Sequence, residues 1–348
     1  MPSSAAAFAP GRVNLIGEHT DYNQGLALPF AIGAGVTVTA TAIGGTRVVA
    51  RAADLGAEDS FDVRRPRRVR GWRAFVRGAV AELSEAGVAV PGARLEITGT
   101  VPRGSGLSSS AALQVALTLA LTALSGAPPP ERTELARLCS RIENDWVGAR
   151  TGLLDQLASL FGERDRALRI DFRSWEIRPV ELRLAGHQLV TLDSGERRGN
   201  AVSGYNRRRA ECARACELLG ISSLRDATLE SAGLLPEPLN RRTRHVVSAN
   251  ARVDDAVAAL VLPDLKRLGR LLDEAHLSLR DDYEVSTPAV EAAIARLKRA
   301  GALGARLLGG GFGGHVLGLL PPGARAPDGA FPVHPEAGAR VLEDQPPA

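Results

Sequence analysis

Four stretches of the chain concentrate residue types that can do chemistry. The first, GRVNLIGEHTDYNQG (residues 11–25), runs from an apolar, strand-like segment directly into Glu18, His19, Thr20 and Asp21. Turns in solvent favour Asn and Asp, but they rarely need Glu, His, Thr and Asp together. The cluster therefore indicates a functional site and not only a solvent-exposed turn.

The second stretch, VPRGSGLSSSAAL (residues 101–113), joins a predicted strand to a predicted helix that starts at Ser108, Ser109 and Ser110. Backbone N–H groups converge in such a loop and the helix dipole adds positive potential, so the stretch predicts a phosphate site. The Gly-Lys-Ser/Thr of a P-loop and the Val-Ala-Ile-Lys strand of a protein kinase are absent. The alternative is a serine-capped helix after a flexible turn.

The third stretch, GGGFGG (residues 309–314), places five glycines around a phenylalanine between two apolar, strand-like runs. Glycines in this number indicate that the backbone closely approaches a ligand or a neighbouring loop. The alternative is a tight bend that needs positive φ angles.

The fourth stretch, RIENDWVGARTGLLDQLASLFG (residues 141–162), carries Glu143 in one predicted helix and Asp155 at the start of the next. A helix N-terminus stabilises an ionised carboxylate, so Asp155 could be a plain helix cap. Held beside a sugar hydroxyl, it could instead take or orient a proton.

The elements that must position these stretches change in kind along the chain. Strands are expected early, at residues 12–17, 25–32, 35–43, 93–102, 167–172 and 187–194, with helices at 73–87, 111–126, 133–148 and 153–162. After about residue 195 helices dominate, at residues 204–220, 244–261, 265–283 and 287–301, followed by a strand-loop-strand unit at 305–320. This order argues for two α+β domains that meet near residues 195–204.

The composition is that of an ordinary globular protein, with 348 residues, 45% hydrophobic and 24% charged. A net charge of +4 suits an anionic ligand without demanding nucleic acid, and the arginine-rich run at residues 64–73 is interpreted as a solvated loop. No apolar run is long enough to span a membrane, and the first residues lack the pattern of a signal peptide. A cytoplasmic protein is therefore expected.

Cysteine and histidine do not predict a metal site. Cys139, Cys212 and Cys216 are too few for a disulfide framework and lack zinc-site spacing, so buried, inert thiols are expected. The six histidines are scattered, with no His-Glu-x-x-His pair.

Together, the four stretches resemble the GHMP family of small-molecule kinases, and within it the galactokinases. SGYNRRRAEC and SLRDDYEVSTP extend the resemblance, in the family's order, over nearly the whole chain. The resemblance implies an α+β fold of two GHMP-kinase domains. Residues 1–196 would form an N-terminal domain with a mixed sheet and helices, of the ribosomal-protein-like βαβ kind. Residues 197–348 would form a helix-rich, ferredoxin-like domain, with the active site in the cleft between the two.

The resemblance also implies an activity, the ATP-dependent phosphorylation of the C1 hydroxyl of α-D-galactose. Asp155 would be the catalytic carboxylate and Arg12 its paired cation. Carboxylates suit a polyol because each accepts two hydroxyl donors in fixed directions. The implied sugar-binding residues are Glu18, His19, Thr20, Asp21 and Tyr205.

ATP and Mg²⁺ are the implied co-substrate and cofactor. Ser110 and Glu143 would hold Mg²⁺, which prefers oxygen ligands, and Trp72 would lie near the adenine. Gly310 to Gly313 would close over the site. The implied ATP-binding loop consists of Gly104, Ser105, Gly106, Leu107, Ser108, Ser109 and Ser110.

Some features leave alternatives open. Leu307 and Leu308 stand where relatives usually have Met-Thr, which bears on the phosphate contacts. A related kinase for N-acetylgalactosamine or a pentose is one alternative, and a non-catalytic sugar sensor is another. The intact serine loop, Arg12 and Asp155 argue against the sensor. The expected partners are galactose and ATP, without nucleic acid or membrane, and the chain is expected to be a monomer.

Overall fold

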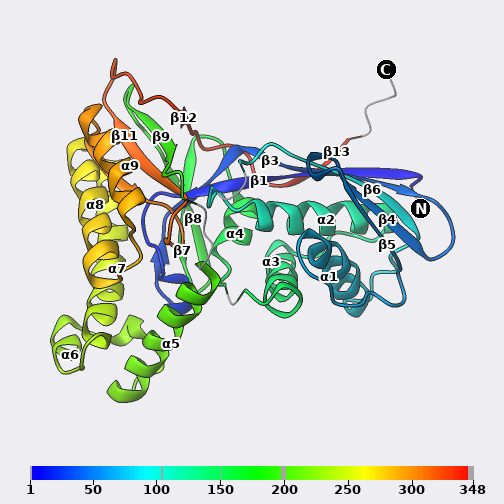
Figure 1. Ribbon diagram of the computed structural model, residues 1–348, viewed down its shortest axis with the longest axis horizontal. Helices are drawn as coiled ribbons and strands as arrows, with labels where there is room; N and C mark the ends of the chain where they lie inside the picture. Colours follow the sequence, from blue (N-terminus) through cyan, green and yellow to red (C-terminus); the bar gives the residue numbers. More distant parts are fainter. Residues whose placement is uncertain (1, 103–104, 150, 197–200, 344–348) are drawn as a thin grey trace.

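The computed structural model describes residues 2–102, 105–149, 151–196 and 201–343. Within them, two halves lie side by side along the long axis of the molecule (Figure 1). The half that contains the N-terminus is built on a six-stranded sheet, and the other half on a four-stranded sheet. This is the two-domain α+β architecture that the sequence predicts.

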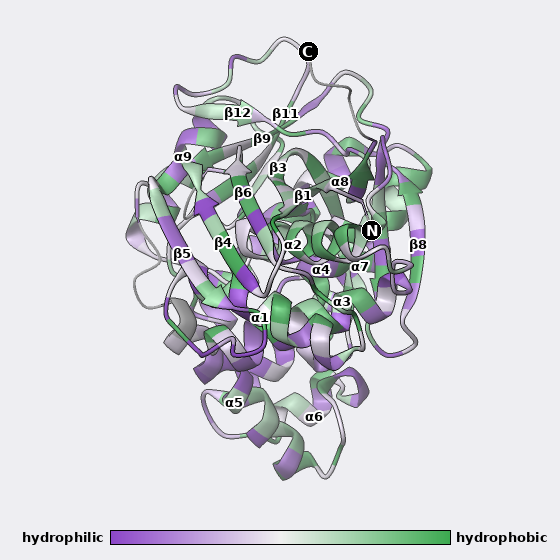
Figure 2. Ribbon diagram, turned by 90° about the vertical axis from the view of Figure 1, so that its right-hand side faces the viewer, coloured by the Kyte–Doolittle hydropathy of each residue, from purple (hydrophilic) through white to green (hydrophobic). Residues whose placement is uncertain are grey.

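The six-stranded sheet has the order β13-β1-β3-β6-β4-β5. Neighbouring strands are antiparallel, except that β6 and β4 run parallel. Buried and exposed positions alternate along β4 and β5, as expected where only one face of a sheet meets the core (Figure 2). The strands are β1 (Ser4–Asn14), β3 (Pro29–Ala42), β4 (Arg47–Ala52), β5 (Ala57–Asp62), β6 (Ala93–Gly99) and β13 (Arg340–Leu342).

Helices α1 to α4 lie along one face of this sheet (Figure 1). The helix α2 is apolar around most of its surface because it packs between the sheet and the other helices (Figure 2). A π-helical segment, η3, follows α3 directly. The bounds are α1 (Trp72–Glu85), α2 (Ser109–Ser125), α3 (Arg132–Arg141), η3 (Ile142–Val147) and α4 (Leu154–Phe161).

The second half has an antiparallel sheet in the order β10-β11-β9-β12, with α7, α8 and α9 packed beside it (Figure 1). A small sheet, β2-β7-β8, lies between the halves. The strands are β2 (Leu26–Ala27), β7 (Arg166–Asp171), β8 (Glu176–Glu181), β9 (Gln188–Asp193), β10 (Gly304–Leu307), β11 (His315–Leu320) and β12 (Ala330–Pro332). The helices are α5 (Ala201–Leu219), α6 (Leu229–Gly233), α7 (Leu239–Val261), α8 (Leu265–Leu277) and α9 (Pro288–Arg299).

Strand pairing crosses the domain boundary that the sequence predicts between residues 196 and 197. The strand β9 precedes that position, yet it pairs with β11 and β12 of the second half. Near the other end of the chain, β13 returns to the first half and pairs with β1. Backbone hydrogen bonds decide which sheet a strand joins, and composition along the chain does not record the partner.

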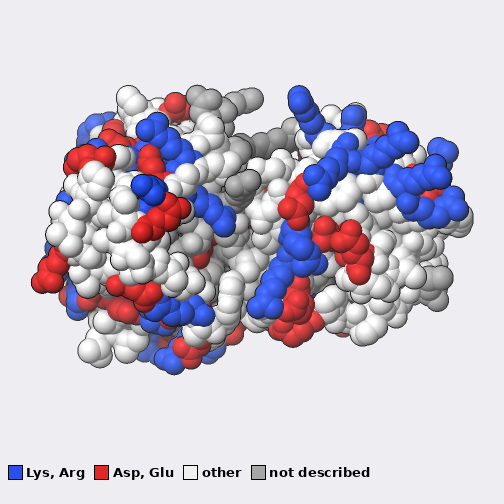
Figure 3. All heavy atoms as spheres, turned by 90° about the horizontal axis from the view of Figure 1, so that it is seen from below, with Lys and Arg blue, Asp and Glu red and all other residues white. Residues whose placement is uncertain are grey.

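The surface and the thiols bear on further sequence-based expectations. No helix in the described ranges is long and apolar enough to cross a membrane. The arginine-rich run at residues 64–73 is largely exposed, and Figure 3 shows basic side chains on this half with acidic ones among them. Cys139 and Cys212 are buried as expected, and burial raises the pKa of the Cys139 thiol to about 12, so it is inert. Cys216, which was also expected to be buried, is only partly buried.

Candidate active site

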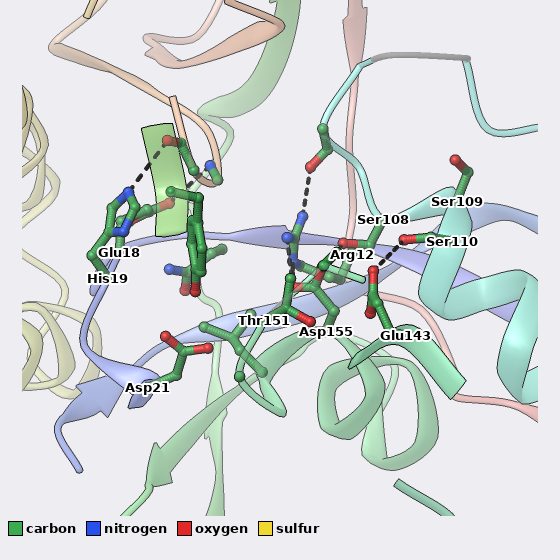
Figure 4. Close-up of a pocket in the computed structure, with 18 of the residues that line it drawn as sticks. Arg12, Glu18, His19, Asp21, Ser108, Ser109, Ser110, Glu143, Thr151 and Asp155 are labelled. Atoms are coloured by element: carbon green, nitrogen blue, oxygen red, sulfur yellow. Dashed lines mark hydrogen bonds and ion pairs between the residues drawn. The ribbon is translucent and has the colours of Figure 1, made fainter. Parts of the chain in front are cut away.

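One pocket between the halves collects most of the residues that the sequence singled out (Figure 4). They come from β1 and the loop after it, the start of α2, η3, the start of α4, α5, and the loop before β11. The predicted residues that line it are Arg12, Glu18, His19, Asp21, Gly106, Ser108, Ser109, Ser110, Glu143, Asp155, Tyr205 and Gly310.

At the centre of the pocket lies an ion pair between Arg12 on β1 and Asp155 in the first turn of α4. The Arg12 Nε and Nη2 atoms are 2.7 and 2.6 Å from Asp155 Oδ1. The guanidinium also donates to the Gly106 carbonyl oxygen at 2.6 Å. The Asp155 side chain makes no capping hydrogen bond to the helix backbone, because its second oxygen accepts from the Ser108 hydroxyl. The geometry therefore does not support the plain helix cap.

The serine-rich loop that the sequence predicts to bind phosphate contacts this ion pair at the start of α2. Ser108, in the left-handed region at φ 61°, precedes the helix, and Ser109 and Ser110 form its first turn, with the helix N-terminus facing the pocket. The loop packs closely on β1 because residue 11 is glycine, where a Cβ would lie 2.4 Å from the Leu107 carbonyl oxygen. The result is a positive helix end beside Arg12.

Two members of the predicted loop do not line the pocket. Ser105 and Leu107 are buried, and the Ser105 hydroxyl accepts a hydrogen bond from the Leu107 N–H at 3.2 Å. These residues shape the loop from behind. Gly104 lies outside the described residues.

Glu143 on η3 is a buried carboxylate at the same end of the pocket. Its two oxygens accept hydrogen bonds from the Ser110 hydroxyl at 3.2 Å and from the Gln156 amide at 2.9 Å. Burial first, and then the nearby charge of Asp155, raise the pKa of the Glu143 carboxyl. No Arg or Lys in the described part of the chain forms an ion pair with it. A bound divalent cation would offset the cost of burying the Glu143 carboxylate.

The Glu18 carboxylate at the opposite end is held by a residue that the sequence analysis missed. Arg306 on β10 is fully buried; it forms an ion pair with Glu18, and its Nη1 donates to the carbonyls of Asn14 and Leu15, both at 2.9 Å. The Gly309 N–H lies 3.4 Å from Glu18 Oε1. Burial raises the pKa of Glu18, and Arg306 opposes the shift. A lone arginine inside the apolar run GARLLGG was the signal available in the sequence.

His19 sits in a cluster of aromatic side chains that includes all three tyrosines of the chain. Its Nδ1 is 2.9 Å from the Tyr22 hydroxyl, which in turn is 2.9 Å from the Tyr283 hydroxyl. Its Nε2 is 3.3 Å from the Gly310 carbonyl oxygen, so the glycine loop of the second half rests on the loop after β1. Tyr22 and Tyr283 were also missed, because each reads in the sequence as an ordinary aromatic residue.

Asp21 projects into the pocket (Figure 4). Burial raises the pKa of its carboxyl to about 6, and the charge of Asp155 adds to the shift. Gly152 makes room for this carboxylate, since a Cβ there would lie 1.9 Å from Asp21 Oδ2. Thr20, in contrast, does not line the pocket, because its buried hydroxyl donates to the Gly17 and Leu26 carbonyls at 2.9 and 2.7 Å. In this structure Thr20 supports the loop, and its contact with a sugar stays a prediction.

Trp72 lies away from the pocket residues, at the first position of α1, where it packs on the core of the first half. Its contact with adenine stays a prediction. No group of three or more His, Cys, Asp or Glu side chains that could hold a metal ion is found in the described ranges.

Comparison of the chain with known proteins identifies its family. Residues 2–42 match the galactokinase galactose-binding signature, residues 74–163 the GHMP kinases N terminal domain, and residues 256–333 the GHMP kinases C terminal domain. The galactokinase of Mycobacterium bovis is 47% identical over 321 residues, which cover 90% of this chain and 88% of the relative. The galactokinase of Thermotoga neapolitana is 38% identical over 317 residues, which cover 91% and 89%.

Comparison with solved structures supports the same family. The crystal structure of Lactococcus lactis galactokinase complexed with galactose matches with a TM-score of 0.90 and 32% identity, over 97% of this chain and 95% of that one. Methanococcus jannaschii mevalonate kinase matches with a TM-score of 0.68 at 17% identity, which shows a shared fold. On this identity and coverage, the chain belongs to the galactokinases of the GHMP kinase family.

Proposed function

We propose that this protein transfers the γ-phosphate of ATP to the C1 hydroxyl of α-D-galactose, giving α-D-galactose 1-phosphate and ADP. The observation that carries the proposal is the position of the Arg12–Asp155 ion pair. On one side of it lies the serine-rich start of α2, which suits a phosphate group, and on the other lie the polar residues after β1, which suit a sugar. One chain supplies both ends of the pocket, so a single subunit carries the whole proposed site, and we propose that the enzyme acts as a monomer.

In the proposed mechanism, Glu18, His19, Asp21 and Tyr205 hold the sugar so that its C1 hydroxyl meets Asp155. The carboxylate orients that hydroxyl and accepts its proton. Arg12, which already contacts both Asp155 and the phosphate loop, stabilises the charge on the phosphoryl group in transit. Phosphoryl transfer needs little covalent help, so this alignment supplies much of the barrier reduction.

Ser110 and Glu143 are the residues that fit Mg²⁺. Both present oxygen, and the buried Glu143 carboxylate pairs with no Arg or Lys in the described residues. Mg²⁺ commonly uses one or two protein carboxylates and completes its shell with substrate phosphates and water. When bound, the ion would neutralise charge on the phosphates of ATP.

Replacing Glu143 tests this assignment. Glu143→Ala should raise the Mg²⁺ concentration needed for half-maximal activity and lower kcat, because one ligand of the ion is lost. The measurement is a Mg²⁺ titration of steady-state turnover at fixed ATP, with circular dichroism to check the fold. Glu134→Ala, an exposed glutamate in the first turn of α3, is the matched control. A Glu143 variant with the wild-type Mg²⁺ profile would make Glu143 a structural carboxylate only.

Substrate preference tests the proposed function itself. We expect kcat/KM for galactose to exceed that for glucose, its C4 epimer, by at least about tenfold, because an inverted hydroxyl leaves a buried acceptor unpaired. A coupled ATP-consumption assay over galactose, glucose, N-acetylgalactosamine and a pentose measures it. Equal turnover of galactose and glucose would refute the assignment, and a preference for another sugar of the panel would replace it.

The pKa of Asp21 predicts a pH dependence of sugar binding. At a pKa of about 6, well above the 3.8 of a free carboxyl, Asp21 is ionised above that pH and takes up a proton below it. Protonation removes acceptor capacity, so galactose affinity should fall as pH drops through about 6, by up to about tenfold per unit. Calorimetry between pH 5 and 8 measures it. Asp21→Asn should bind more weakly, with a flat profile; a persisting slope would assign the titration to another group.

A further inference from the structure

Asn14 is a pocket residue to which the proposed mechanism gives no task. It is the last residue of β1 and lies two positions after Arg12. Alternate residues of a strand point to the same face, so Asn14 and Arg12 both reach the pocket. Asn14 therefore lines the same pocket as Arg12, on the strand that leads into the loop carrying Glu18.

The Asn14 side chain is buried and yet unpaired. Its exposed fraction is 2%, and neither Oδ1 nor Nδ2 has a hydrogen-bond partner among the described residues. Its backbone, in contrast, is tied down, since the carbonyl accepts from Arg306 at 2.9 Å. Buried polar groups in folded proteins are nearly always satisfied, and an orphan amide is costly. An amide that lines a pocket and lacks protein partners points to a ligand that supplies them.

The two orphan atoms narrow the chemistry of that ligand. The amide oxygen needs a donor and the amide nitrogen needs an acceptor. Phosphate oxygens of ATP only accept, so they would leave Oδ1 unpaired. A hydroxyl both donates and accepts, and a sugar presents several side by side.

We propose that Asn14 is a substrate-binding residue whose carboxamide pairs with a hydroxyl of the sugar ring, an assignment that rests on the proposed function. Its place beside Arg12, at the reacting end of the pocket, favours the hydroxyl on C2, the carbon next to C1. In this proposal Asn14 contacts the C2 side of the sugar ring, and the loop residues Glu18 and Asp21 contact other hydroxyls.

Two substitutions separate binding from structure. Asn14→Ala should weaken galactose binding, measured by calorimetry without nucleotide, by at least tenfold and leave the KM for ATP within about twofold. Asn14→Leu removes the orphan amide at similar volume, so the ligand-free protein should unfold at a higher temperature than wild type. Thr122→Val is the matched control, because Thr122 on α2 is a buried hydroxyl without a partner in the described part, away from the pocket. It should leave galactose affinity unchanged.

Deoxy sugars then locate the contact. Wild type should prefer galactose over 2-deoxygalactose, and Asn14→Ala should lose that preference while keeping those at C3, C4 and C6. The proposal is overturned if every preference persists in Asn14→Ala, or if galactose affinity does not change. Turnover of galactose by the wild type tests the proposed function separately, so a failure of the Asn14 assignment can be told apart from a failure of the proposed function.

Discussion

Asp155→Asn is expected to lower kcat by roughly 10² or more, the usual cost of losing a positioned base. Asparagine keeps the size of the side chain but removes its charge and most of its basicity. Galactose should still bind with near wild-type affinity, because Glu18, His19, Asp21 and Tyr205 remain. Steady-state kinetics and sugar-binding calorimetry on the same preparation separate the two effects.

Asp264 provides the matched control for this substitution. It caps α8 through a hydrogen bond from the Arg267 N–H and lies outside the pocket. Asp264→Asn should change stability slightly and leave kcat unchanged. If Asp155→Asn behaves in the same way, Asp155 has only a structural role and the proposed mechanism is wrong.

Arg12 should respond together with Asp155. In Arg12→Lys, a compact ammonium replaces a planar fork that now contacts both Asp155 and the Gly106 carbonyl, so kcat should fall. The double variant should be little worse than the poorer single variant, because the two groups act as one unit. Additive losses would show that they act independently.

The contrast between Asp155 and Thr20 shows how far the sequence could predict the site. Motif content identified both as candidates, but only packing decides where a side chain points. Arg12 and Asp155 are 143 positions apart and meet because α4 packs on β1. Thr20 has the same local surroundings as Asp21, yet its hydroxyl is used up by the turn itself. Local sequence does not contain that difference.

In the fold, too, some features could be predicted from local sequence and others could not. Long helical segments such as α2 were predicted correctly in kind, whereas residues 25–32 and 35–43, expected as two strands, are largely joined in the single strand β3. The strands β4, β5, β8, β12 and β13 were not predicted, since short strands carry little periodic signal. For β12 and β13, the strand partners lie far away in the sequence, in β9 and β1.

Arg306→Met is expected to have the largest effect on stability. It would leave the Glu18 carboxylate, whose side chain is 3% exposed, without its counter-ion, and it would remove the donors to Asn14 and Leu15. Breaking one side of a buried ion pair typically costs about 3–5 kcal/mol of unfolding free energy. Chemical denaturation measures the change. Arg178→Met is the matched control, because Arg178 forms a solvent-exposed pair with Glu176 and should change stability little.

Adding Glu18→Gln distinguishes stability from function. With the carboxylate neutralised, the double variant Glu18→Gln/Arg306→Met should recover part of the lost stability, because no unpaired charge remains buried. It should not recover galactose binding, since the sugar loses a charged acceptor that Arg306 held in place from the second half of the molecule. Recovery of both would mean that Glu18 does not touch the sugar and that the pair only joins β10 to the end of β1. Recovery of neither would mean that the donors to the Asn14 and Leu15 carbonyls, and not the ion pair, hold the two halves together at this point.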